Sequence, residues 1–177
     1  VEYCSVTKNI ELLFGPIFHK FKVSGHTAVF FDVLEPYVLN DKILYISAEV
    51  LPLFVTYCKA QHRLATVERC LLHLECKMMD FDSILSLLRR NSMYTALFYV
   101  YNIGLNDFVT PLQILFERLF ELVAVREKSK SPKETEEFLI LGYKALLYLK
   151  TAITGLTFPH QTDMQSDQMI IIKRELM

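Results

Sequence analysis

The chain has 177 residues, of which 52% are hydrophobic and 22% are charged, and its formal net charge is −1. This apolar content is enough for a sizeable core and argues against intrinsic disorder. The near-neutral charge, with no basic stripe, argues against a nucleic-acid-binding surface. The mean hydropathy of +0.26 is high for a free-standing domain, and the chain starts at Val1. We therefore expect a fragment of a larger chain, with apolar surface that neighbouring segments or partners cover.

The sequence also bears on membranes and on redox chemistry. The longest uncharged run, residues 91–106, is polar in places and shorter than the roughly 18–20 apolar residues that span a bilayer. We expect no transmembrane span, although peripheral attachment through partners stays open.

Three of the four cysteines lie inside amphipathic helical patterns, where a free cysteine behaves as a small buried hydrophobe. This usage favours a reducing, cytosolic environment.

The spacing of apolar residues is helical along almost the whole chain, as in Leu64, Val67, Leu71 and Leu74. A convincing run of strict alternation, typical of strands, is missing. Gly15-Pro16 predicts an interruption of the first helical stretch, because proline lacks a backbone donor. The expected helices cover about residues 6–22, 27–39, 48–60, 64–77, 82–90, 93–103, 111–127 and 133–154, with a final helix near 170–176. Short connections make neighbouring helices antiparallel, and a helical pair takes about 30 to 40 residues, as in helical-hairpin repeat arrays.

Residues 104–113, GLNDFVTPLQ, separate two strongly apolar runs and have the sequence of a helix–helix joint. We expect Thr110 to be the N-cap, Pro111 to occupy the first helical position and Gln113 to complete a capping box. Gly104 suits the left-handed residue that ends the preceding helix. A structural joint is therefore favoured over an active-site loop.

The strongest candidates for chemistry are Cys58, His62, Cys70 and His73. On helices, Cys58 and His62 are four residues apart, and Cys70 and His73 are three apart, so each pair could share a face as a zinc site requires. Against this, Cys70 lies at the edge of the apolar stripe, and the spacing fits no common zinc signature. We favour core cysteines and expect no metal and no cofactor.

Other polar residues are better explained as helix starts. Asp80 and Asp82 precede an apolar helical run, which favours caps over a catalytic carboxylate pair. Ser131-Pro132 followed by Glu134 repeats the pattern of an N-cap and a first-turn proline. The sequence contains no Walker loop, GxGxxG, HExxH or GxSxG motif. A non-enzymatic protein is therefore expected.

One block of sequence resembles a known family. It is YVYN-x-GLNDF-x-TPL, and segments 31–39, 67–74, 144–149 and 155–159 add to it in order and spacing. Together they resemble the central helical region of the eighth vacuolar protein sorting subunit family, which is specific to the CORVET tethering complex. The resemblance covers about residues 27–160, and 1–26 and 161–177 are assigned only weakly. The residues of the structural family motif are Tyr99, Tyr101, Asn102, Gly104, Asn106, Asp107, Phe108, Thr110 and Pro111.

The resemblance implies a fold and a function. Residues 1–177 would be a single segment of an α-solenoid of antiparallel, clathrin-heavy-chain-like helical hairpins, cut from a larger chain. It would act as a scaffold in an endosomal membrane tether that serves vesicle-mediated protein transport to the vacuole or lysosome. The implied partners are other tethering-complex subunits and an early-endosomal Rab GTPase, the latter through other regions of the full chain. The implied location is cytoplasmic and peripheral on the early endosome membrane.

Two alternatives stay open from the sequence. The first is a clathrin-repeat segment of a HOPS or coat protein, and the second is a small helical zinc-binding domain. Because each repeat contacts its neighbours, we also expect the ends of the segment to expose apolar surface and to promote self-association.

Overall fold

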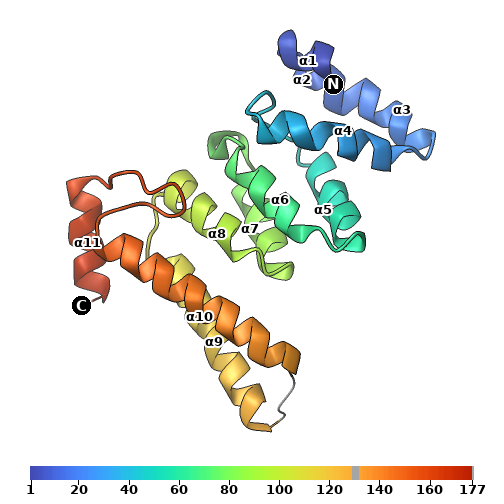
Figure 1. Cartoon of the computed structure of the whole chain (residues 1–177). Helices are drawn as coiled ribbons and strands as arrows, with labels where there is room; N and C mark the ends of the chain where they lie inside the picture. Colours follow the sequence, from blue (N-terminus) through green and yellow to red (C-terminus); the bar gives the residue numbers. More distant parts are fainter. Residues whose placement is uncertain (129–131, 177) are drawn as a thin grey trace. The chain divides into compact units, whose positions relative to one another are not determined.

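A computed structural model describes residues 1–128 and 132–176 of the chain (Figure 1). The regular structure of these residues is helical, and their sole β-type pairing is an isolated antiparallel bridge between Leu156 and Asp163. The predicted all-α fold class is therefore confirmed. The chain divides into two compact units, Val1–Ala96 and Leu97–Met177, which are described separately.

The N-terminal unit is a succession of short helices joined by turns and, before α5, by a longer connector at residues 40–49 (Figure 1). The last of them, α8, continues into the C-terminal unit. Their bounds are α1 (Glu2–Val6), α2 (Ile10–Leu12), the π-helix η1 (Leu13–Ile17), α3 (Phe18–Val23), α4 (Thr27–Leu39), α5 (Val50–Ala60), α6 (Leu64–Leu72), the 3₁₀-helix η2 (Cys76–Met78), α7 (Phe81–Arg90) and α8 (Tyr94–Tyr99).

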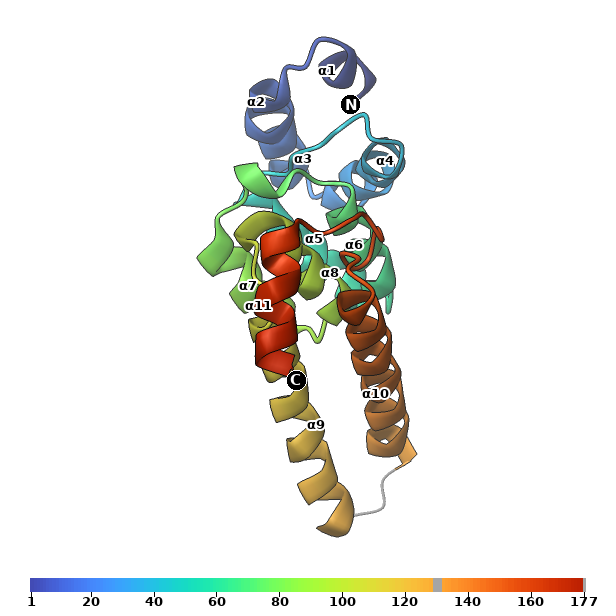
Figure 2. The same cartoon turned by 90° about the vertical axis from the view of Figure 1, so that its left-hand side faces the viewer.

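The C-terminal unit contains the two longest helices of the described residues, which lie side by side (Figure 2). They are preceded by a π-helix and followed by an irregular segment that leads to the last helix, so the predicted C-terminal helix is confirmed. Their bounds are η3 (Val100–Leu105), α9 (Thr110–Lys128), α10 (Pro132–Ile153) and α11 (Ser166–Leu176). Ser131, predicted as the cap of α10, lies outside the described residues.

Phenylalanine side chains form the centre of the N-terminal core. The rings of Phe18 on α3 and Phe30 on α4 have centroids 5.0 Å apart, and those of Phe31 on α4 and Phe54 on α5 are 5.3 Å apart. All four side chains are at most 2% exposed. Because burial of each large side chain stabilises a fold by about 1.5–3 kcal/mol, this cluster fixes α3, α4 and α5 against one another.

A recurrent left-handed turn ends the helices. At six helix ends in the described residues, the residue after the C-cap has positive φ, and the amide of the next residue donates to the carbonyl five positions earlier, which is a Schellman motif. Glycine holds only two of these positions. The six left-handed residues are Lys8, Gly25, Asp41, His62, Ser92 and Gly155. This shared ending is a structural repeat that the sequence, lacking a glycine at four of the sites, conceals.

Several predicted helix boundaries differ from the structure, and two of the differences have a clear physical cause. Gly15-Pro16 does not break the first stretch, because a π-helical turn at 13–17 carries the chain past the missing proline donor. The helix predicted over 64–77 ends instead at Leu72. There the backbone of Glu75 becomes extended, and its amide donates to the carbonyl of Leu44 in the connector before α5, at 2.8 Å.

Candidate functional site: the joint at residues 99–111

The predicted family motif lies in the C-terminal unit, where η3 ends and α9 begins. Its apolar and amide side chains turn inward: Tyr101, Asn102 and Phe108 are each at most 6% exposed. Such burial is unusual for an asparagine, which needs hydrogen-bond partners inside the protein. The motif is therefore a packed joint in which the polar side chain of Asn102 is part of the core.

A buried hydrogen-bond network holds this joint together. The Asn102 side-chain amide donates from Nδ2 to the carbonyl of Phe158 at 3.1 Å. The Tyr148 hydroxyl lies 2.8 Å from two acceptors, Oδ1 of Asn102 and the carbonyl oxygen of Phe108, which share its single proton. The network thus ties η3 to α10, to the start of α9 and to the segment after α10, which are up to 56 residues apart in sequence.

Aromatic rings surround the network. The centroids of Phe98 and Tyr148 are 4.5 Å apart, and Phe158 packs edge-on against Phe98 at 5.4 Å. At the rim, the ring of Tyr99 meets that of His160 edge-on at 5.3 Å. Burial raises the pKa of Tyr148 far above its ordinary value of 10.0, so its hydroxyl remains a proton donor at physiological pH.

The start of α9 is capped by a different residue from the one that the sequence predicts. Asp107 accepts hydrogen bonds from the amides of Val109 and Thr110, both at 3.0 Å. The helix begins at Thr110, so Thr110 and Pro111 occupy its first turn, and the prediction of a Thr110 capping box is wrong. Asp107 is favoured over Thr110 as the cap because a carboxylate interacts favourably with the positive end of the helix dipole.

The preceding helix also ends at a different residue. Asn106, with φ of 55°, takes the left-handed conformation predicted for Gly104, which lies inside η3. Asparagine tolerates this conformation better than most residues with a side chain. Its side-chain oxygen also accepts a hydrogen bond from Gln168 on α11, so the same residue ends η3 and contacts the last helix.

The end of α10 is closed by a second apolar cluster, in which Phe108, Ala152, Met164 and Ile172 are buried together. Gly155 follows α10 with φ of 79°, and a Cβ at this position would lie 2.9 Å from Sδ of Met169. A side chain there would therefore be strained, and the flexible end of Met169 on α11 would have to shift. The joint, the segment after α10 and α11 form one packed assembly inside the C-terminal unit.

Comparison with known proteins decides the family. The model of the family described as Vps8 central TPR matches residues 29–177. The chain belongs to this Vps8 family. It is 28% identical to the mouse and 27% identical to the human vacuolar protein sorting-associated protein 8 homolog, over 99% of its own length in both cases. It is 24% identical to vacuolar protein sorting-associated protein 8 of Saccharomyces cerevisiae over 84% of its length.

The match concerns only part of each relative. The chain spans about 12% of the length of the mouse and human proteins and 11% of the yeast protein. No solved structure matches it. The family resemblance read from the sequence is confirmed, and a clathrin-repeat segment of a HOPS or coat protein gains no support from these comparisons.

The zinc alternative finds no support in the geometry of this Vps8-family chain. Cys58 and Cys70 are both 1% exposed, and burial raises the pKa of their thiols to about 11 and about 12. His62 is exposed and occupies a left-handed turn, and Nδ1 of His73 lies 2.8 Å from Oδ1 of Asp41. Within residues 1–128 and 132–176, no group of three or more suitable side chains could hold a metal ion.

Asp80 occupies the N-cap position of α7, and Asp82 lies in its first turn, as predicted. None of the helices in the described residues is long and apolar enough to cross a bilayer.

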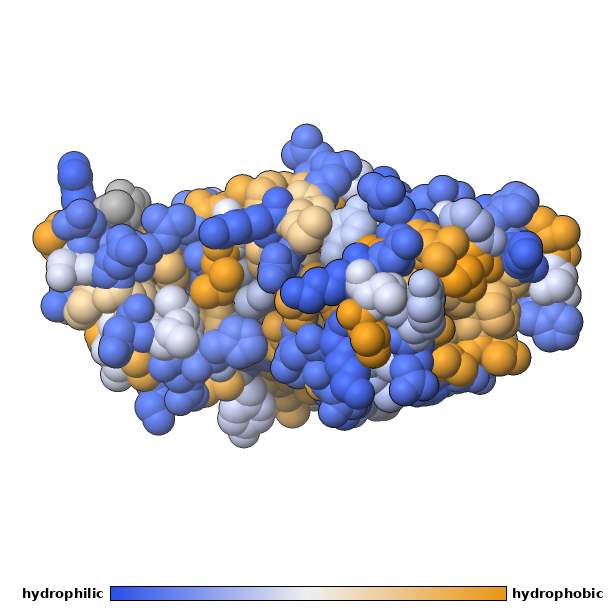
Figure 3. Space-filling model, turned by 90° about the horizontal axis from the view of Figure 1, so that it is seen from above, coloured by the Kyte–Doolittle hydropathy of each residue, from blue (hydrophilic) through white to orange (hydrophobic). Residues whose placement is uncertain are grey.

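One side of α10 in the C-terminal unit is an uncovered apolar face. Helix α10 buries Leu141, Ala145 and Tyr148, yet its opposite side is also apolar. A helix that is apolar all round is normally covered on every side. The outward side chains are 45–73% exposed and comprise Leu139, Ile140, Tyr143, Leu146, Leu147 and Ile153, which together we call the outer α10 face. Figure 3 shows patches of apolar side chains among hydrophilic ones on the face of the molecule that it draws.

The sequence located the joint but missed the residues that complete it. Tyr148, Phe158 and Gln168 lie 40 or more residues from their hydrogen-bond partners in the motif. The family resemblance includes the segments that hold Tyr148 and Phe158, but no local pattern predicts these bonds. The outer α10 face, in contrast, could have been found from the sequence, since apolar residues fall on both sides of this helix.

Proposed function

We propose that this chain is a non-enzymatic scaffold segment of a subunit of an endosomal membrane-tethering complex of the CORVET type. The single observation that carries the proposal is membership of the Vps8 central TPR family over residues 29–177. The relatives are named for vacuolar protein sorting. The segment would support Rab-dependent tethering and fusion of endosomes, and so vesicle-mediated protein transport to the vacuole or lysosome.

The geometry of both units supports a scaffold. Short helices end in the same left-handed turn, which turns the chain back sharply and favours stacked hairpins. The buried polar side chains of the described residues, Asn102, Thr151 and Thr157, are all used in bonds within the fold. These polar groups stabilise joints, and a network bonded in this way offers little to a substrate.

The outer α10 face supports a role in a larger assembly. Apolar surface of this kind is rarely left open on a soluble monomer, and it usually marks an interface. In a solenoid subunit it would be covered by further helices of the same long protein or by another subunit of the tether. We propose that the contacts with Rab are made by other regions of the full-length protein, and that attachment to the early endosome membrane is peripheral and occurs through partners.

Affinity purification of the full-length protein from its own cells tests this proposal. We expect other subunits of a vacuolar sorting tether to co-purify in stoichiometric amounts. The double variant Leu139→Glu/Leu146→Glu should lose at least one of these subunits, whereas Glu136→Gln, a charge-neutralising change on the same helix, should retain them. Purification of the intact protein without any such subunit would contradict the proposed function.

A second measurement addresses the Rab partner. Immobilised early-endosomal Rab, loaded with a non-hydrolysable GTP analogue or with GDP, is incubated with the full-length protein and with residues 1–177 alone. We expect GTP-dependent retention of the full-length protein only. Retention of the isolated segment would instead assign the Rab contact to this part of the chain.

A further inference from the structure

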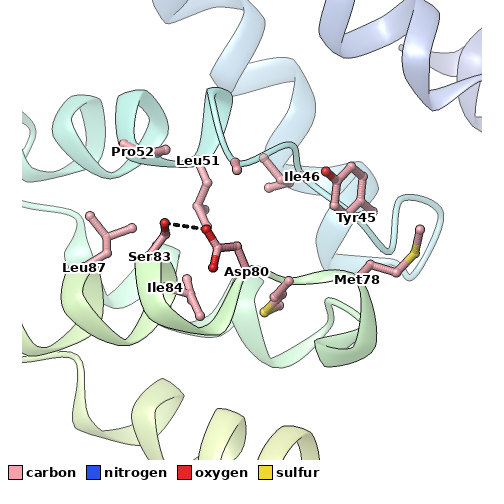
Figure 4. A pocket seen from close by; sticks show the side chains of 11 residues that line it. Tyr45, Ile46, Leu51, Pro52, Met78, Asp80, Ser83, Ile84 and Leu87 are labelled. Atoms are coloured by element: carbon pink, nitrogen blue, oxygen red, sulfur yellow. Dashed lines mark hydrogen bonds between the residues drawn. The ribbon is translucent and has the colours of Figure 1, made fainter.

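We propose that a cavity in the N-terminal unit binds a lysine or arginine side chain presented by a partner polypeptide. The cavity lies between the connector before α5, α5 itself and the start of α7, and its volume is about 40 Å³ (Figure 4). A single water needs roughly 10–15 Å³ measured in the same way. The space therefore admits a slender side chain.

The walls of the cavity are apolar. Ile46 on the connector, Leu51 on α5 and Ile84 on α7 are at most 8% exposed and form a fixed surface. Met78 is 56% exposed and lies at the edge of the cavity, as Figure 4 shows. Because methionine is unbranched and adapts its shape readily, it can close over an incoming chain of methylene groups.

Asp80 adds a negatively charged side chain to these apolar walls. Its carboxylate accepts a hydrogen bond of 2.6 Å from the Ser83 hydroxyl, and Figure 4 shows it among the side chains of Leu51, Ser83 and Ile84. The hydrogen bond from Ser83 holds the pKa of Asp80 below its ordinary value, so the group stays ionised at physiological pH. Among the described residues that line the cavity, it is the one charged side chain.

The combination of apolar walls and one carboxylate favours an occupant that is apolar along its length and positively charged at its end. Lysine and arginine place an apolar stem on hydrophobic surface while the charged head reaches a polar group. A charge-assisted hydrogen bond to Asp80 would satisfy that head. The surrounding segment, residues 75–83, adds Glu75 and Asp82 against one cation, Lys77, and so favours a positive ligand.

Methyl NMR of the 177-residue chain tests the proposal with a defined probe. The probe is the capped heptapeptide acetyl-GSLRLSG-amide, and its matched control carries citrulline, which keeps the shape of arginine without its charge. The methyl groups of Met78 and Met79 line the cavity, and those of Met93 and Met164 are buried elsewhere and serve as internal references. We expect the arginine peptide to shift the first pair selectively, and to bind about fivefold more tightly than the citrulline peptide, as for an exposed ion pair.

Substitutions distinguish binding in this cavity from a general attraction of positive peptides to the acidic segment. Asp80→Asn keeps a side chain that can cap α7 and should remove the preference for arginine. Asp82→Asn, which neutralises a neighbouring carboxylate outside the cavity, should leave the preference in place. Ala48→Phe should fill the cavity and abolish binding without touching the cap.

The proposal is overturned by equal affinity for the two peptides, by equal losses in Asp80→Asn and Asp82→Asn, or by shifts confined to Met93 and Met164. Each of these outcomes would leave the scaffold function untouched, because the cavity is independent of the partners proposed above.

Discussion

The buried network at Tyr148 gives the most direct quantitative prediction. Replacing Tyr148 by Phe removes one hydroxyl from a side chain that is 1% exposed, while the ring and its contact with Phe98 at 4.5 Å remain. No large cavity forms, so the cost is that of a lost hydrogen bond. Asn102 Oδ1 and the Phe108 carbonyl lose the proton that they share. A buried acceptor left in this way costs about 1–3 kcal/mol in the free energy of unfolding.

Urea unfolding followed by circular dichroism measures this loss. With an m-value of about 1–3 kcal/mol/M, the midpoint should fall by roughly 1 M while m stays unchanged. Tyr143→Phe is the matched control, because it removes the same hydroxyl from the same helix at a side chain that is 73% exposed. It should change the free energy of unfolding by less than about 0.5 kcal/mol.

A double-mutant cycle locates the loss in the network. Asn102→Ala combined with Tyr148→Phe should destabilise less than the sum of the two single changes, with a coupling energy of about 0.5–3 kcal/mol. The reasoning would be refuted if Tyr148→Phe were no more destabilising than Tyr143→Phe, or if its effect added fully to that of Asn102→Ala.

Four further predictions follow from the described contacts. Asp107→Ala should lower the free energy of unfolding in urea by about 1 kcal/mol, as loss of a cap does. Thr110→Ala should lower it clearly less. If Thr110→Ala were the more destabilising change, Thr110 would be the cap after all. Ser92→Gly should stabilise the protein by about 1 kcal/mol, because it relieves a left-handed residue at φ of 56°, and an unchanged melting temperature would contradict this. The pKa of Tyr148 is raised in the folded state, so its contribution to the free energy of unfolding is complete below the unfolded pKa of 10.0 and is lost as the pH rises above that value. A Tyr148→Phe variant that loses stability at alkaline pH in the same way as the unchanged protein would exclude this linkage. Light scattering of residues 1–177 should show self-association that Leu146→Glu reduces, and a clean monomer at high concentration would count against an apolar interface on α10.

The sequence by itself was sufficient for the fold class and for the position of the joint. Three- and four-residue apolar spacing reflects the geometry of the α-helix and does not depend on what packs against it, so segments such as 27–39 emerge with their observed ends. The chemistry of residues 104–113 likewise marks a stop and a start within ten positions. These signals are local, which is why they can be read without a structure.

Tertiary structure decided which side chains perform each local task. Thr110 and Asp107 are both able to cap α9, and only the path of the chain after η3 places the carboxylate at the two free amides. The turn after α5 gives a left-handed conformation to His62, although local preference would favour glycine there. Both outcomes depend on how the chain is held after a helix ends.

The same holds for the core of the joint. Asn102 and Tyr148 look like surface residues from their types, and they are buried because partners 46 and 56 positions away satisfy their polar atoms. Pairings over such distances follow from how helices pack, and packing energy depends on the whole arrangement of side chains. The sequence therefore determined where this protein turns, and only the tertiary structure decided which residues hold each turn and which apolar side chains remain uncovered.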